Sequence, residues 1–197
     1  MDIKKMLAIA KGEFPADLVI KNARVANVFT LEYEKKDVAL YGGTIAGIGE
    51  GYSGKEEVDA SGTVLAPGFI EGHCHIESTM LTPAGFAEMV LLRGTTTVMA
   101  DPHEIANTCG MDGLEFMYRE SLNVPLDIFF LAPSCVPASP FETPHEELDA
   151  WAIKSSYEQR WCTALGEVMN YPAVINGDEG MWSKLLASWD VVKSGHA

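Results

Sequence analysis

Apolar and polar positions form short alternating runs over residues 17–66. The runs DLVIKNARVANVF, KDVALY, TIAGIG and VDASGTVLAP are separated by turn-forming residues such as the Gly42-Gly43 pair. Such runs are typical of short β-strands joined by turns. We therefore predict a small antiparallel β-structure here, preceded by a short amphipathic helix over residues 2–11.

After Pro67, five apolar runs with strand character are interleaved with segments that carry apolar residues at helical spacing. The predicted strands are residues 68–72, 95–100, 126–132, 163–169 and 189–195. The predicted helices are residues 83–93, 111–122 and 179–187, and a segment that follows the capping-box pattern Thr143-Pro144-His145-Glu146. This alternation predicts a parallel sheet of right-handed βαβ units. We expect two domains, residues 1–66 and residues 67–197.

Two α/β folds fit the second domain. An eight-stranded β/α barrel takes about 250 residues, so residues 67–197 would supply its first half and the start of a fifth strand. A small doubly wound sheet has the same periodicity, and the pattern alone does not separate the two. Both folds build their sites at the carboxyl ends of the strands.

Charge and cysteine usage narrow the class of protein. The chain has 28 acidic and 14 basic residues, a formal net charge of -14, which disfavours nucleic acid and anionic membranes as partners. Its 4 cysteines form no CxxC pair, and no stretch reaches the roughly 20 apolar residues of a membrane span. We expect an unexported, cytoplasmic protein that binds a small molecule or metal cations.

Histidines and carboxylates recur where the predicted strands end. In PGFIEGHCHIEST, His73 and His75 project to the same face because side chains two apart in a strand do so. Further donors at strand ends are Asp101, His103 and Glu104 in ADPHEIAN, Glu167 in LGEVMN, and His196 in SGHA. An isolated HxH is more often a pair of surface or hydrogen-bonded histidines, but this clustering favours one centre for divalent transition metals.

Such a centre suggests hydrolysis. Metal ions bridged by a carboxylate lower the pKa of bound water and make hydroxide available to attack a carbonyl or amidine-like carbon. Glu167 is the candidate bridge, because a carboxylate inside an apolar run is costly unless it is paired or binds a cation. The candidates for proton transfer are Glu77, Asp101 and Glu104.

These segments resemble a known family. PGFIEGHCHIEST is similar to the first-strand motif of the amidohydrolase superfamily, and HIES, GTTTVMADPHEIAN and LGEVMN resemble the adenine deaminases within it. The resemblance covers nearly the whole chain and implies the first half of a metal-dependent (β/α)8 barrel, preceded by part of a small β-sandwich. It implies a binuclear centre of Mn²⁺ or Fe²⁺, with Zn²⁺ as an alternative. The implied ligands are His73, His75, His196 and the bridging Glu167, with supporting or auxiliary-metal positions at Asp101, His103 and Glu104.

The implied activity is hydrolytic deamination of adenine to hypoxanthine and ammonia by metal-activated hydroxide, in cytoplasmic purine salvage and in a homo-oligomer. The alternatives are another cyclic amidohydrolase or deacetylase of the superfamily, or a non-catalytic metal-binding module. The chain ends before the family's sixth-strand histidine and eighth-strand aspartate. We therefore expect an N-terminal fragment, incomplete as a catalyst, whose open half-barrel exposes strand edges and apolar helix faces.

Overall fold

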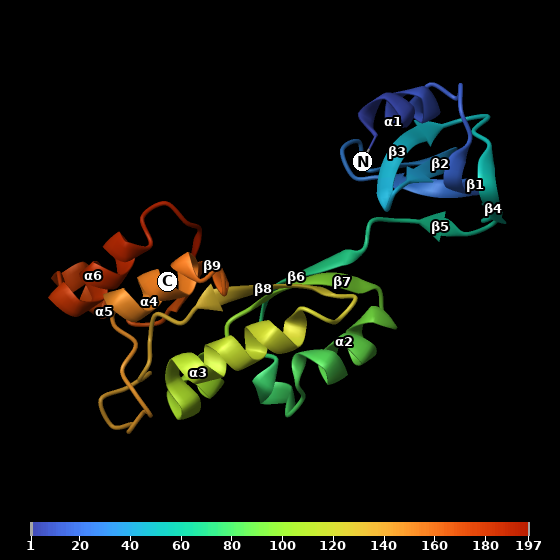
Figure 1. The fold of residues 1–197 in the computed structure, drawn as a ribbon. Helices are drawn as coiled ribbons and strands as arrows, with labels where there is room; N and C mark the ends of the chain where they lie inside the picture. The colour runs from blue at the N-terminus through green and yellow to red at the C-terminus, as the bar shows by residue number, and fades with distance from the viewer. Residues whose placement is uncertain (1, 197) are drawn as a thin grey trace. The chain divides into compact units, whose positions relative to one another are not determined.

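The computed structural model describes residues 2–196 and contains two compact units (Figure 1). The first unit ends at Pro67 and the second begins at Gly68. Within the described residues, no helix combines the length and the apolar character needed to cross a membrane.

The first unit is a mixed five-stranded sheet with one helix. Its elements are α1 (Ile3–Ala10), β1 (Ala16–Asn27), β2 (Glu32–Tyr41), β3 (Thr44–Gly49), β4 (Gly54–Asp59) and β5 (Val64–Leu65). Strands β1, β2 and β3 pair antiparallel, as predicted, but β4 and β5 pair parallel with β1. The prediction of antiparallel structure is therefore wrong for β4 and β5. After β3 the chain returns to the end of the sheet where β1 begins, with Gly54 opposite Ala16, so β4 runs parallel to β1.

A bulge in β1 is closed by a carboxylate. The β1–β2 register shifts between Ile20 and Ala23, and Asn22 adopts a positive φ of 60° there. The Asp37 carboxylate accepts the Asn22 N–H at 3.0 Å and a hydrogen bond from Lys21 Nζ at 2.8 Å. Asp37 thus satisfies the backbone group that the bulge removes from the ladder.

Replacing Asp37 with asparagine is expected to destabilise the first unit at pH 6, and the difference from wild type should shrink as the pH falls into the acid range in which the folded-state carboxylate takes up a proton. Burial acts to raise the pKa of Asp37, but hydrogen bonds from Lys21 and the Asn22 N–H outweigh it and hold this pKa below 3.8. A carboxylate with a lowered folded-state pKa stabilises the fold above its unfolded-state pKa, and that stabilisation is lost as pH falls through the folded-state value. Hydrogen exchange of the β1 and β2 amides in the full chain, corrected for intrinsic rates, measures the difference in stability between the variant and the wild type at each pH. A difference independent of pH would contradict the assignment, and exposed Asp112→Asn is the control.

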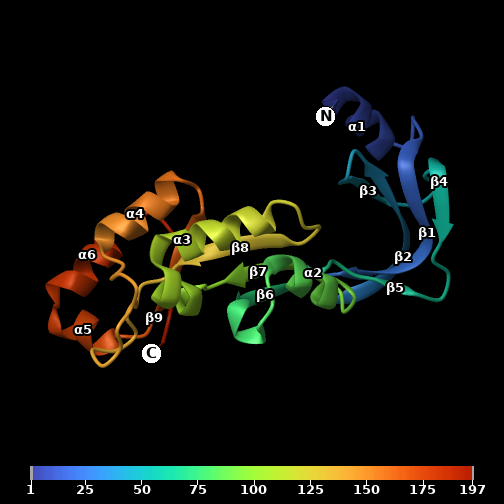
Figure 2. The same cartoon turned by 60° about the horizontal axis from the view of Figure 1, so that its bottom comes forward.

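The second unit is built on five parallel strands. They are β6 (Phe69–Cys74), β7 (Thr95–Ala100), β8 (Asp127–Ala132), β9 (Cys162–Val168) and β10 (Lys193–Gly195). The strands lie in the sheet in their chain order without a reversal, and the sheet curls (Figures 1 and 2). A doubly wound sheet reverses its strand order at a switch point, whereas a β/α barrel adds strands in sequence. The unit therefore has the architecture of the first half of a β/α barrel.

Helices connect successive strands of this sheet. They are the 3-10 turn Glu77–Thr79, α2 (Pro83–Leu91), α3 (His103–Ser121), α4 (Ala150–Glu158), α5 (Tyr171–Asn176) and α6 (Glu179–Ala187). The prediction for α6 is confirmed, and α5 was not predicted. Helix α3 begins eight residues before the predicted Met111, because a kink at Gly110, with φ 61°, joins a first segment to the predicted one. His103 and Glu104 consequently lie in the first turn of a helix.

The predicted start of the third helix, at Pro144, is wrong. Helix α4 begins at Ala150, and Asp149 caps it by accepting the Ala152 N–H at 2.9 Å. The Glu146 carboxylate instead accepts the N–H of Met111 at 2.6 Å, at the kink of α3. The segment before α4 is thus held by tertiary contacts, which override its local capping pattern. Strand β10 is likewise confined to the last three residues of the predicted fifth strand.

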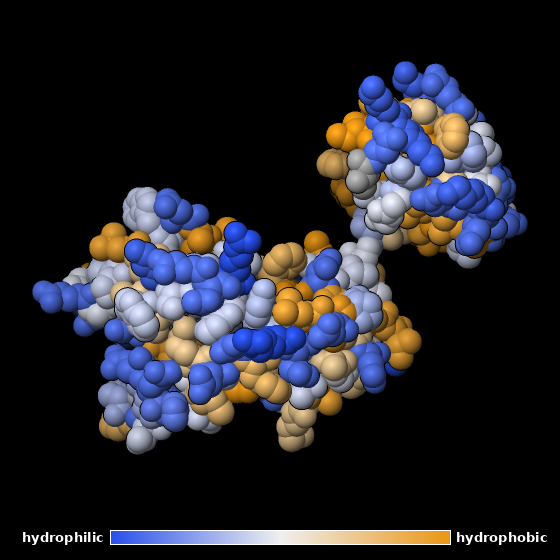
Figure 3. Space-filling model, in the orientation of Figure 1, coloured by the Kyte–Doolittle hydropathy of each residue, from blue (hydrophilic) through white to orange (hydrophobic). Residues whose placement is uncertain are grey.

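The core of the second unit lies between the sheet and its helices. Its largest cluster contains Ile76, Met117, Phe130, Ile153 and Leu165, each at most 2% exposed. Large apolar side chains are nevertheless exposed elsewhere on this unit, among them Met80, Leu92, Trp151 and Val192. Figure 3 shows apolar patches among hydrophilic side chains on its visible face. Exposed apolar helix and sheet surface of this kind is what a half-barrel is expected to present.

Candidate metal centre

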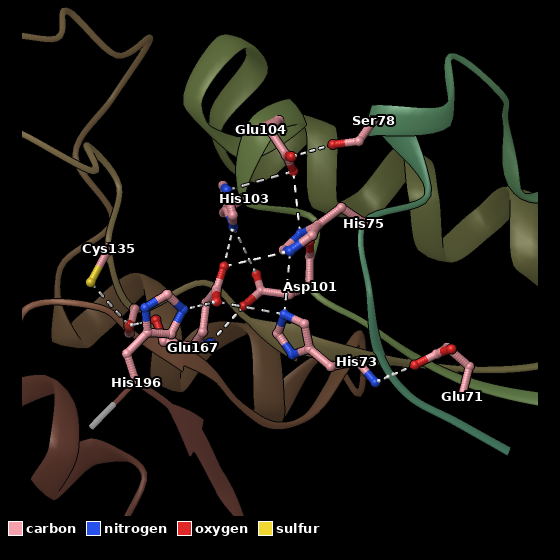
Figure 4. A network of polar contacts seen from close by, with 11 residues as sticks. Glu71, His73, His75, Ser78, Asp101, His103, Glu104, Cys135, Glu167 and His196 are labelled. Carbon is pink, nitrogen blue, oxygen red and sulfur yellow. Dashed lines mark hydrogen bonds and ion pairs between the residues drawn. The ribbon is translucent and has the colours of Figure 1, made fainter.

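The sequence-predicted donors meet where the strands of the second unit end (Figure 4). His73 lies in β6 and His75 directly after it, and their Nε2 atoms are 3.3 Å apart. Glu167 comes from β9 and His196 follows β10. Carboxyl ends of adjacent parallel strands share one rim, which is why residues distant in sequence converge.

Glu167 lies between four histidines, and its two oxygens face different pairs of them. Oε1 is 3.5 Å from His75 Nε2 and 3.5 Å from His103 Nδ1. Oε2 is 3.7 Å from His73 Nε2 and 2.7 Å from His196 Nε2. A carboxylate whose oxygens each face their own imidazoles has the arrangement needed to bridge two cations.

Asp101 is fully buried and connects three of these side chains. Its backbone carbonyl accepts a hydrogen bond from His75 Nδ1 at 2.8 Å, which places the proton on Nδ1 and leaves the Nε2 lone pair directed at the centre. Its Oδ2 accepts the Glu167 N–H at 2.6 Å, and its Oδ1 lies 3.6 Å from His103 Nδ1. The adjacent Asp101 carboxylate raises the pKa of His103, although burial opposes this.

A second carboxylate layer lies behind His75 and His103. Glu104 Oε2 is 3.5 Å from His75 Nδ1 and 3.7 Å from His103 Nε2, and Ser78 donates to the other oxygen of Glu104. Burial raises the pKa of the neighbouring Glu77 to about 7. Burial acts in the same direction on Glu104, but hydrogen bonds from Ser78 and Glu77 outweigh it and lower its pKa. Of these two carboxyls, Glu77 therefore takes up a proton more readily.

The donor set fits divalent metal ions. Within residues 2–196, the buried polar side-chain atoms without a hydrogen-bond partner are His73 Nδ1, Glu77 Oε2, Asp101 Oδ1, His103 Nδ1, Glu104 Oε2 and Asn107 Oδ1. Native proteins leave few such atoms, and here all but Asn107 Oδ1 belong to the histidines and carboxylates described above. Three groups have ligand atoms mutually within 4.8 Å, namely His73–His75–Glu167, His75–His103–Glu104 and Asp101–His103–Glu167. Imidazole and carboxylate donors suit divalent transition metals.

All the sequence-predicted site residues lie in this cluster or against it, with Glu77 one carboxylate further out. Sequence reasoning missed three residues that lie just outside the cluster. Gly166 packs against the Asp101 carboxylate, Ser134 donates a hydrogen bond to the Glu167 carbonyl, and Lys184 donates one to the Ser134 carbonyl. Gly166 had a usable signal, because glycine inside a strand often marks a close backbone approach. Lys184 had another, because it occupies the apolar stripe of α6 beside Met181. Nothing local in the sequence indicates Ser134.

Comparison with known proteins agrees with the fold. The model of the amidohydrolase family matches residues 64–197. The chain is 47% identical over 197 residues to the adenine deaminase of Clostridium acetobutylicum, an alignment that covers 99% of this chain and 34% of that protein. The chain thus spans about a third of the length of this curated relative.

Solved structures support the architecture at low sequence identity. N-acyl-D-glutamate deacylase from Bordetella bronchiseptica, in complex with zinc and a phosphonate inhibitor, superposes with a TM-score of 0.63 at 15% identity, covering 93% of this chain and 45% of that one. D-aminoacylase, described with a binuclear metal centre, gives a TM-score of 0.54 at 16% identity, covering 77% and 38%. At these identities the similarity establishes the fold alone.

Proposed function

The chain belongs to the amidohydrolase family, and on that premise we propose that it serves the hydrolytic deamination of adenine to hypoxanthine and ammonia. The observation that carries the proposal is Glu167, whose two oxygens each face separate histidines at the strand ends. The similarity to an adenine deaminase supports the choice of substrate class.

In this proposal His73, His75 and His196 would supply imidazole ligands, and Glu167 would supply the carboxylate that the ions share. When bound, such ions lower the pKa of water and polarise the carbon under attack. In the overall reaction the oxygen of water bonds to C6 of the purine, the C6–N6 bond breaks, and the amine leaves as ammonia after gaining a proton.

The remaining polar residues orient this machinery. Asp101 holds the Glu167 backbone and His75, so we assign it a positioning role rather than contact with substrate. Glu77 lies against Glu104, and its Oε1 accepts the Ile105 N–H at 3.3 Å. That geometry favours a supporting role for Glu77 behind Glu104. His103 and Glu104 are proposed as auxiliary ligands, because they complete a donor group with His75.

The finer assignments follow from the family. We propose Mn²⁺ or Fe²⁺ as the metals, with Zn²⁺ as the alternative, because the imidazole–carboxylate set accepts all three. We also propose a cytoplasmic homo-oligomer acting in purine salvage. The net charge of -14 supports a small neutral substrate over nucleic acid or an anionic membrane.

The full-length product of the gene, loaded with Mn²⁺, is expected to release one ammonia for each hypoxanthine that it forms from adenine. Replacing His75 with alanine should lower the rate by at least about 100-fold, because loss of a partner outside the ligand sphere alone typically costs 10–100-fold in affinity or activity. An exposed replacement, His145→Ala, is the control. Ring opening of hydantoin or dihydroorotate without ammonia release from adenine would favour another cyclic amidohydrolase. Bound metal without turnover of any of these compounds would favour a non-catalytic metal-binding module.

A further inference from the structure

The peptide groups on both sides of Glu167 are held by side chains from neighbouring strand ends. Asp101, just after β7, accepts the Glu167 N–H at 2.6 Å through Oδ2. Ser134, just after β8, donates from Oγ to the Glu167 carbonyl at 2.7 Å. Asp101 is 0% exposed and Ser134 is 1% exposed, so water does not compete for either bond.

These two hydrogen bonds hold β9 just beyond the point where its backbone pairing with β8 ends. The last paired residues of β8 and β9 are Ala132 and Leu165, two positions before Glu167. From the β8 side, Asp101 and Ser134 supply the hydrogen bonds to the Glu167 main chain. On its other side, the Glu167 carbonyl also accepts the Met169 N–H at 3.1 Å, and Val168 pairs with Gly195 of β10. The direction of its Cα–Cβ bond, and hence the position of its carboxylate, depends on that main chain.

A buried lysine extends this arrangement to α6. Lys184 is 8% exposed, and its Nζ donates to the Ser134 carbonyl at 3.0 Å. Within residues 2–196, no carboxylate lies within 4.0 Å of this ammonium group. Burying an unpaired ammonium is costly, and an apolar residue would pack in its place. An apolar side chain at position 184 could not donate the hydrogen bond that Lys184 gives to the Ser134 carbonyl.

We propose that Asp101, Ser134 and Lys184 fix the bridging carboxylate of Glu167 for metal binding. We call these three residues the clamp. The inference rests on the proposed function, because it presumes that Glu167 binds metal. Ligand groups must be held within about 0.5 Å of their working positions, and residues outside the ligand sphere do this. Asp101, Ser134 and Lys184 are positioning residues, since they act on the metal through Glu167.

Ser134→Ala and Lys184→Met in the full chain test the clamp. Each is expected to weaken Zn²⁺ binding, measured by competition with a chelator, by about 10–100-fold, the usual effect of such partners. Each should also shift the visible absorption of the Co²⁺-loaded chain. Because Lys184 acts through Ser134, the double variant should lose little more than Ser134→Ala alone.

Ser156→Ala is the matched control. Ser156 is equally buried and donates from Oγ to the Ile153 carbonyl at 2.7 Å, but it lies within α4. It should lower the unfolding midpoint while leaving Zn²⁺ affinity and the Co²⁺ spectrum unchanged. If Ser134→Ala and Lys184→Met behave in the same way, the clamp is refuted while the metal centre stands. A wild-type chain that binds neither ion overturns the proposed function together with the clamp.

Discussion

Replacing Glu167 with glutamine is expected to reduce bound metal from two ions per chain to at most one and to weaken the remaining affinity by more than about 100-fold, beyond the usual effect of losing an outer partner. The amide keeps the shape of the side chain but removes its charge and one of the two acceptor oxygens. Those oxygens face different histidines at 2.7–3.7 Å, so one ion would lose this oxygen ligand and the other would keep only a neutral amide oxygen.

The control for this change is Glu158→Gln. Its carboxylate is 68% exposed, and among the described residues its one ion pair is with Lys154 at 3.9 Å, an i,i+4 contact on α4. Metal stoichiometry and affinity should therefore match the wild type. Equilibrium dialysis with elemental analysis measures both variants. Two ions retained by Glu167→Gln at wild-type affinity would remove Glu167 from the centre.

Replacing Gly166 with alanine is expected to destabilise the second unit by about 2–3 kcal/mol, in the upper range for overpacking a filled site. A Cβ at this position would overlap Asp101 Oδ2 and lie 2.8 Å from Asp101 Cγ and 2.9 Å from the Ala132 carbonyl oxygen. The Asp101 carboxylate is buried and cannot move without breaking its bond to the Glu167 N–H, and the Ala132 contact is with the backbone of β8. Metal affinity should fall together with stability.

Gly72→Ala separates this steric effect from the general effect of removing a strand glycine. Gly72 precedes His73 as Gly166 precedes Glu167, but a Cβ there meets nothing within 4 Å. This variant should be neutral or slightly stabilising, because alanine restricts the unfolded chain. Urea unfolding followed by tryptophan fluorescence compares the two. Equal stability of Gly166→Ala and wild type would contradict this prediction. It would show that Asp101 and the Ala132 carbonyl can move apart from β9 without cost.

The pattern of apolar and polar residues predicted the secondary structure correctly in segments with one clear periodicity. The strand after Gly94 and the helix from Glu179 to Ala187 were predicted with their observed bounds, because apolar periodicity and flanking turn residues agree there. His73 and His75 were predicted to share a face for the same reason, since the two-residue period of a strand leaves no alternative. The convergence of Glu167 and His196 with them followed from the parallel order of the strands.

The remaining features depend on contacts that no local window contains. Helix α4 starts late because Glu146 is engaged at the kink of α3, a partner 35 residues away in sequence. Ser134 donates its side-chain hydrogen bond to the Glu167 carbonyl, 33 residues further on. The periodicity also allowed a doubly wound sheet, and only the observed strand order separates that fold from the barrel.

X-ray absorption at the metal edge, on the wild-type chain loaded with Zn²⁺ or Mn²⁺, tests the central claim most directly. The account predicts two ions per chain with mixed imidazole and carboxylate ligation, and a weaker imidazole signal when His73 and His75 are both replaced by alanine, because His196 and His103 remain. A chain that takes up no metal, or whose bound metal keeps the same ligands after those replacements, would contradict it.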